Sequence, residues 1–313
     1  MKNLLKLASI ACLLFTIVSC NNSSSENENT ASDSTVISHK LGNTTIYGQP
    51  TKIVVFDFGS LETLNELGIK PVGIPKNYTP DHLAALKDDA QVADAGGLME
   101  PNFEKINSLA PDLIIISPRQ ERFYDEFVKI APTVFVDIDN SNYMKSFEEN
   151  SLMLGKLVGQ EEVVKEKIAA TKEKLKQAQE QLKSNTENAL IAMHNNGRFS
   201  VYGAGSRFGF IHAELGVKPA VDQLEEATHG QKVSNEFIVE TDPDYLFIVD
   251  RNEAVKGKGA DKSEIENKLI QQTKAYKQGH IVYLNPQVWY LSGGGITSTN
   301  MMIDEALNVL KKG

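Results

Sequence analysis

The chain has 313 residues, a formal net charge of −9 at pH 7 and an apolar fraction of 41%. This length allows two domains of ordinary size, and the apolar fraction is that of a globular protein. The negative charge argues against a general nucleic-acid-binding protein, which needs a basic surface.

The first 20 residues have the features of an export signal. Lys2 and Lys6 precede an apolar run over residues 7–18, and Ser19 stands before Cys20. A basic start, a short apolar core and a small residue before the cut are typical of a secretory signal peptide. Residues 17–20 resemble the lipobox of bacterial lipoproteins, so we expect cleavage after Ser19 and lipidation of Cys20. An ordinary cleaved signal with a chance cysteine is the alternative.

The two cysteines of the chain, Cys12 and Cys20, both lie in this leader. No disulfide, thiolate metal site or cysteine nucleophile is therefore expected in the exported body. The next residues, up to about residue 36, are polar and bury too little surface to fold. We interpret residues 20–36 as a lipidated cysteine followed by a flexible tether.

Short apolar runs alternate with helical patterns through the first half of the body. Runs that are continuous rather than alternating in hydrophobicity are typical of a parallel sheet covered on both faces. We expect strands over residues 53–58, 71–74, 113–116 and 133–138, and helices over 61–67, ending at Gly68, and 121–130.

Residues 161–184 predict one long amphipathic helix. The segment contains no Gly or Pro, and apolar residues recur at helical spacing at Val164, Ile168, Leu175, Ala178 and Leu182. At ~1.5 Å per residue this helix spans ~35 Å. A plain surface helix is one interpretation, but its position between two α/β halves favours a rigid connector.

The second half repeats the α/β scheme, with strands expected over 189–193, 199–202, 245–249 and 281–284 and a closing helix over 300–310. The predicted fold is α/β, with two Rossmann-like lobes joined by a single long helix. The expected domains are a signal peptide (1–19), the tether (20–36), an N-terminal lobe (37–158), the connecting helix (159–184) and a C-terminal lobe (185–313).

An internal sequence repeat supports the two-lobed interpretation. Glu104 stands seven residues before Pro111, which is followed by Asp112 and a predicted strand. Glu236 stands in the same relation to the Pro-Asp pair at residues 243–244. Pro-Asp before a strand is common, but the matched order of acid, helix, Pro-Asp and strand favours a duplication. Two like lobes joined by a helix form a cleft between them.

Three arginines follow predicted strands: Arg119, Arg207 and Arg251. In open α/β sheets ligands bind beyond the carboxyl ends of strands, so these arginines can converge on one cleft. Arginine offers a permanent charge and planar donors that suit an anionic, oxygen-rich ligand. For any single arginine a surface ion pair is the simpler interpretation, but three at equivalent positions favour an anion site.

Enzyme motifs are scarce. The glycine-rich segment 203–209 fits neither the dinucleotide fingerprint nor the phosphate loop nor the nucleophile elbow. No nucleophile, base and orienting partner occur together, so we predict a binding protein without a catalytic site or a cofactor.

The whole body resembles the ferric-siderophore-binding lipoproteins of ABC importers, which are class III substrate-binding proteins. The resemblance lies in the lipobox, the two lobes, the long helix and the segments 205–209 (GSRFG), 228–231 (THGQ), 233–236 (VSNE) and 289–290 (WY). It is closest to the catecholate branch, which takes up enterobactin-type, petrobactin-type or related ligands.

The resemblance implies a role for each candidate residue. Arg119, Arg207 and Arg251 match the arginines that hold the anionic catecholates. His229 and Tyr290 match side chains that complete the coordination of Fe(III) when a siderophore supplies only four oxygen donors. Fe(III) is a hard cation that favours phenolate oxygen and accepts imidazole.

Glu104 and Glu236 match the pair that docks the two lobes onto the two permease subunits. One exposed acid per lobe suits a two-fold symmetric partner, although an acid at a helix start can instead merely favour the helix dipole.

The resemblance thus implies a monomeric, lipid-anchored extracytoplasmic protein that captures a ferric catecholate siderophore and delivers it to an ABC permease dimer with its ATPase. A helical bridge limits hinge motion, so modest closure on binding is expected. Two alternatives stay open: a haem- or vitamin B12-binding protein of the same superfamily, and an exported lipoprotein hydrolase.

Overall fold

A β-hairpin precedes the first sheet. The computed structural model describes residues 34–224 and 229–311, which belong to one compact unit. Strand β1 (Ser34–His39) pairs in antiparallel register with β2 (Gly42–Tyr47). The Thr44 hydroxyl donates a hydrogen bond to the carbonyl of Thr133 and joins the hairpin to that sheet. The hairpin is therefore attached to the N-terminal lobe through β7.

The N-terminal lobe contains a parallel five-stranded sheet in the order β5-β4-β3-β6-β7. Its strands are β3 (Ile53–Val55), β4 (Gly73–Ile74), β5 (Ala93–Asp94), β6 (Leu113–Ile116) and β7 (Thr133–Phe135). The strand expected over 53–58 ends early, because the Asp57 side chain accepts a hydrogen bond from the Ser60 backbone and caps a helix that begins at Phe58.

The helices of this lobe are α1 (Phe58–Glu66), α2 (Ala84–Asp88), α3 (Phe103–Ser108), α4 (Tyr124–Val128) and α5 (Tyr143–Leu157). The helix expected over 121–130 is instead a 3-10 helix (Pro118–Phe123) followed by α4. Helix α5 was not predicted from the sequence.

The C-terminal lobe contains a mixed sheet in the order β11-β9-β8-β12-β13, with β10 beside β8. The strands are β8 (Asn188–Asn195), β9 (Arg198–Tyr202), β10 (Lys218–Pro219), β11 (Gln231–Val233), β12 (Tyr245–Asp250) and β13 (Ile281–Leu284). β12 runs parallel to β8 and β13, but β9 is antiparallel to β8. The Asn196-Gly197 turn explains this departure from the expected repeat, because both residues have positive φ, as a two-residue hairpin requires.

The helices around this second sheet are short except for the last. They are α7 (Phe210–Ala213), α8 (Asn235–Thr241), α9 (Arg251–Lys256), α10 (Lys262–Ile265), α11 (Lys274–Gln278) and α12 (Ile296–Leu310). The closing helix expected over 300–310 is thus one turn longer at its start.

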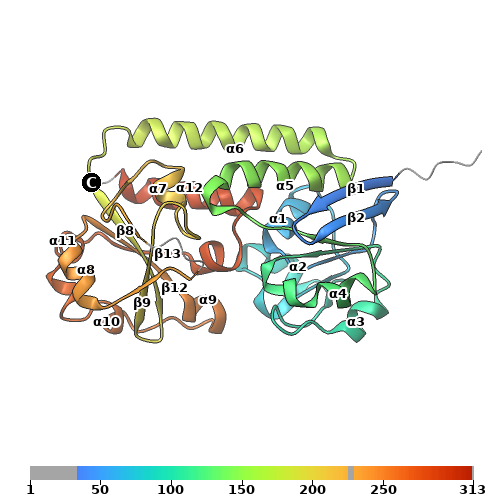
Figure 1. Cartoon of the computed structure of the whole chain (residues 1–313), viewed down its shortest axis with the longest axis horizontal. Helices are drawn as coiled ribbons and strands as arrows, with labels where there is room; N and C mark the ends of the chain where they lie inside the picture. The colour runs from blue at the N-terminus through green and yellow to red at the C-terminus, as the bar shows by residue number, and fades with distance from the viewer. Residues whose placement is uncertain (1–33, 225–228, 312–313) are drawn as a thin grey trace, which may run out of the picture. The chain divides into compact units, whose positions relative to one another are not determined.

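Helix α6 (Glu161–Leu182) extends along both lobes (Figure 1). Its buried residues are the predicted apolar positions together with Thr171. α12 runs beside α6, where Asn300 donates to Thr171 and Lys174 pairs with Asp304. α1, α5, α6 and α12 share one continuous apolar core with the near faces of both sheets, and two further clusters cover the far faces. None of the described helices is long and apolar enough to cross a bilayer.

The internal sequence repeat is accompanied by a repeated backbone geometry. Ala110 and Asp242, each directly before the Pro-Asp pair, both have left-handed backbone angles (φ 46° and 43°). Asp112 then accepts hydrogen bonds from Thr51 and Lys52 at the start of β3, and Asp244 accepts one from Asn188 at the start of β8. The same device therefore fixes the start of a central strand in each lobe.

Candidate functional site

The structure places five of the predicted residues in one cleft with a cavity volume of about 800 Å³: Arg119, Arg207, Arg251, His229 and Tyr290. This volume lies in the range of small-molecule sites. Both lobes contribute to the cleft, with Arg119 from the N-terminal lobe and the other four from the C-terminal lobe.

The arginines reach the cleft from strand ends. Arg119 lies in the 3-10 helix that follows β6, and Arg251 is the first residue of α9, directly after β12. Arg207 lies in the turn between β9 and α7. That turn needs Gly209, because a Cβ there would overlap with the carbonyl of Ala204. Arg119 and Arg251 thus follow the carboxyl ends of parallel strands, as ligand-binding residues of open α/β sheets do, whereas Arg207 follows β9, which runs antiparallel to β8.

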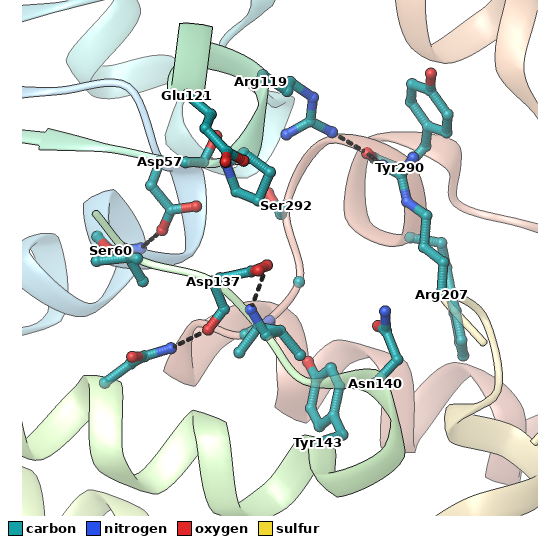
Figure 2. Close-up of a pocket in the computed structure, with 18 of the residues that line it drawn as sticks. Asp57, Ser60, Arg119, Glu121, Asp137, Asn140, Tyr143, Arg207, Tyr290 and Ser292 are labelled. Atoms are coloured by element: carbon teal, nitrogen blue, oxygen red, sulfur yellow. Dashed lines mark hydrogen bonds between the residues drawn. The ribbon is translucent and has the colours of Figure 1, made fainter. Parts of the chain in front are cut away.

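Tyr290 is the residue on which the three arginines meet. Arg119 and Arg207 both donate hydrogen bonds to its backbone carbonyl, as Figure 2 shows for Arg119, and Arg251 Nε donates to its hydroxyl at 2.9 Å. The guanidinium carbon of Arg207 lies 4.2 Å from the centre of the ring. Tyr290 itself lies on a single π-helical turn (Gln287–Leu291), a feature frequent at functional sites.

The positive charge of this cluster is not neutralised within the described residues, where none of the three arginines lies within 4.0 Å of a carboxylate oxygen. Burial, followed by the charge of Arg207, lowers the pKa of Arg119 to about 10. Burial also lowers the pKa of Arg207. An anionic ligand would relieve this repulsion and restore the lost solvation.

The phenol of Tyr290 is prepared for ionisation. Burial by itself raises its pKa, but the charge of Arg207 and the hydrogen bond and charge of Arg251 outweigh burial, so the net pKa is lowered. Tyr143 and Tyr202 differ, because burial raises the pKa of each to about 12. A phenol with a lowered pKa loses its proton to a hard cation at less cost.

We expect Tyr290 to ionise at a lower pH than the other buried tyrosines. An alkaline titration followed by tyrosinate absorbance would show an early step, and Tyr290→Phe would remove that step. Tyr202→Phe is the matched control and would leave it in place. An unchanged first step in Tyr290→Phe would contradict this assignment.

His229 lies at the rim of the same cleft with an exposed side chain. Its backbone carbonyl accepts a hydrogen bond of 3.0 Å from the hydroxyl of Tyr202, which fixes the main chain at this point. Thr228, which belongs to the same sequence motif, lies outside the described residues.

Glu104 and Glu236 lie outside the cleft at equivalent positions of the two lobes. Each is the second residue of its helix, after the caps Asn102 and Ser234, and each is exposed. A hydrogen bond with Ser234 is the main cause that lowers the pKa of Glu236. The predicted lipidation site, Cys20, lies outside the described residues.

Sequence reasoning missed the carboxylates of the cleft. Asp57, Glu121 and Asp137 line the side formed by the N-terminal lobe. Asp57 and Asp137 each follow a strand, β3 and β7, so the rule that located the arginines also applies to them. Trp289 also lines the cleft, and its indole N–H donates to Glu305 at 2.7 Å.

Two α/β lobes, a helix along both and a charged cleft between them are the architecture of a substrate-binding protein. Residues 53–288 match the family model described as "Periplasmic binding protein". The chain belongs to this family, whose members bind substrates without transforming them.

Individual relatives cover nearly the full chain. The petrobactin-binding protein YclQ of Bacillus subtilis is 39% identical over 313 residues, which are 99% of this chain and 98% of that protein. Its crystal structure superposes with a TM-score of 0.87 over 90% of this chain and all of that one, at 41% identity.

Two further relatives are similar over most of their length. The ferric-anguibactin-binding protein FatB of Vibrio anguillarum is 35% identical over 277 residues, covering 87% of this chain and 86% of that protein. The periplasmic catecholate-siderophore binding protein VctP of Vibrio cholerae has a TM-score of 0.80 at 34% identity, covering 88% of this chain and 99% of that one.

Proposed function

We propose that this protein captures a ferric catecholate siderophore in the cleft between its lobes and delivers it to an ABC importer. The observation that carries the proposal is the group of three arginines around Tyr290 with no carboxylate partner among the described residues. Ferric catecholate complexes are anionic and rich in oxygen, so they would supply the missing negative charge. YclQ, FatB and VctP are named as petrobactin-, ferric-anguibactin- and catecholate-siderophore-binding proteins, which supports a siderophore as the ligand.

Each side chain has a distinct task in this proposal. Arg119, Arg207 and Arg251 hold the catecholate oxygens by charge-assisted hydrogen bonds. Tyr290 and His229 supply phenolate oxygen and imidazole nitrogen to Fe(III) when the siderophore leaves two coordination positions open. Tyr290 must turn its hydroxyl from Arg251 to the metal, and its lowered pKa favours the phenolate needed there.

The remaining tasks concern the membrane. Glu104 and Glu236, as exposed and equivalent acids of two similar lobes, would meet arginines on the two subunits of a permease dimer coupled to an ATPase. A lipid on Cys20 would hold the protein outside the cell membrane near that permease. The protein would act as a monomer.

Trp289 provides the test, because it is the only tryptophan of the chain and lines the cleft. Titration with ferric catecholate complexes is expected to quench its fluorescence with a Kd in the micromolar range or below. Ferric hydroxamates and haem should have little effect. Free tryptophan amide, titrated in parallel, corrects for light absorbed by the complexes. Quenching by haem without quenching by ferric catecholates would refute the proposal.

A further inference from the structure

The cleft contains carboxylates as well as arginines. Asp57, Glu121 and Asp137 lie on the side formed by the N-terminal lobe, which also contributes Arg119, whereas Arg207 and Arg251 come from the C-terminal lobe (Figure 2). Asp57 follows β3 and Asp137 follows β7. Both carboxylates therefore lie beyond the carboxyl ends of parallel strands of one sheet.

Asp57 has no cationic partner although a guanidinium is near. Its Oδ1 accepts a hydrogen bond of 2.7 Å from the backbone of Ser60. Arg119 lies close enough to affect the pKa of Asp57, but it donates to the carbonyl of Tyr290 instead. Burial raises the pKa of Asp57 to about 6. An enclosed carboxylate in this state gains free energy when a cation approaches.

Asp137 also has no ion pair in the described part of the chain, but it is more exposed than Asp57, and the charge of Lys40 acts to lower its pKa. Its Oδ1 accepts from the backbone of Ile138, and no ion pair to Asp137 occurs among residues 34–224 and 229–311. Burial is the largest cause that raises its pKa. Glu121 differs, because its Oε2 lies 3.3 Å from Lys40. The carboxylates of the cleft without an ion-pair partner among the described residues are therefore Asp57 and Asp137.

Ser60 adds a neutral polar group to this side of the cleft. The residue is 2% exposed and lines the cleft, and its hydroxyl lies near the carboxylate of Asp57, whose pKa it acts to lower against the effect of burial.

We propose that Asp57 and Asp137 form a subsite for a protonated amine of the ligand, while the arginines hold its anionic iron-chelating end. This inference rests on the proposed function and narrows the ligand to siderophores that carry an ammonium group. A metal ion fits less well, because no group of three or more metal-ligating side chains is found within the described ranges. An ammonium needs only two or three acceptors.

The experiment compares three ferric bis-catecholate complexes that differ only in the linker. One linker carries a secondary amine, the second the same nitrogen as a tertiary N-methyl amine, and the third the same nitrogen acetylated and neutral. Both charged complexes are expected to bind about tenfold more tightly than the neutral one, as one charge-assisted hydrogen bond would provide. The N-methyl complex controls for size, because it is larger yet keeps its charge.

Variants locate the effect. Asp137→Asn and Asp57→Asn are expected to remove most of the preference for the charged linkers. Glu126→Gln, which removes an exposed carboxylate of α4 outside the cleft, is expected to keep it. Asp57 caps α1, so circular dichroism must show that its variant is folded. Asp137 caps no helix, so Asp137→Asn alone is sufficient for the test if Asp57→Asn does not fold.

Equal affinity of the wild-type protein for all three complexes would overturn the amine subsite and leave the proposed function intact. A preference that survives in Asp137→Asn and in a folded Asp57→Asn would equally overturn it. If none of the complexes binds, the proposed function itself fails.

Discussion

Replacing Arg207 by glutamine is expected to weaken the binding of ferric catecholates by about 30- to 150-fold, because a hydrogen bond to a charged group contributes about 2–3 kcal/mol. Arg207 lies over the ring of Tyr290, and both Arg207 and Arg119 donate hydrogen bonds to the backbone carbonyl of Tyr290. Arg207→Lys should recover only part of the loss, since lysine restores the charge but not the planar pair of donors. Fluorescence titration gives the affinities.

Loss of affinity must be separated from loss of folding. Arg207 repels Arg119 in the free protein and lowers its pKa, so Arg207→Gln is expected to melt at the same or a higher temperature. Arg198→Gln is the control, because Arg198 is an exposed residue of β9 that does not line the cleft. Equal affinities of the two variants within about twofold would contradict the role of Arg207.

Gly295→Ala is expected to have the largest effect on stability, with a loss of about 3 kcal/mol and a fall in Tm of about 6–10 °C. Gly295 precedes α12 and packs against α1. A Cβ there would overlap with Glu62 Oε2 and lie 2.5 Å from the carbonyl of Gly59. Neither neighbour can move easily, because one is helix backbone and the other a fully buried carboxylate.

Glu62 explains why the cost is high. It accepts hydrogen bonds from His82 at 2.6 Å and from the backbone of Ser298 at 2.8 Å, and so caps the start of α12 from the other lobe. Displacing it would leave a buried carboxylate poorly paired.

Gly97→Ala is the matched control for Gly295→Ala. Its Cβ would meet its nearest neighbour at 3.6 Å, which is ordinary contact, and we expect a change below about 0.5 kcal/mol. Thermal unfolding followed by circular dichroism measures both variants. Equal melting temperatures of Gly295→Ala and the wild type would refute this account of the lobe junction.

The fold was largely predictable because its strands are short, continuous apolar runs. Continuous runs such as residues 113–116 indicate buried parallel strands wherever they occur. The Asn-Gly turn at residues 196–197 had a sequence pattern that was overlooked, since Asn-Gly between apolar runs predicts a hairpin. Helix α5 was likewise overlooked, since its buried residues Tyr143, Phe147, Ser151 and Leu154 recur at helical spacing.

The candidate site was predictable in its residue types but not in its contacts. The position of Arg119 after a strand is visible in the sequence, whereas its hydrogen bond to the main chain of Tyr290, 171 residues away, is not. The carboxylates Asp57 and Asp137 were within reach of the same reasoning. Their lack of an ion-pair partner among the described residues is visible only in the structure, because it depends on residues that are distant in the sequence.

The shared core of α1, α6 and α12 also has a kinetic consequence. Arginines from both lobes already meet at Tyr290 in the free protein, so the ligand does not have to wait for the site to assemble. Association can then proceed at a rate set by diffusion and electrostatic steering, and ligands will differ mainly in how slowly they leave. Because the shared core also resists separation of the lobes, we expect rapid release of the ligand to require a partner protein that moves the lobes apart.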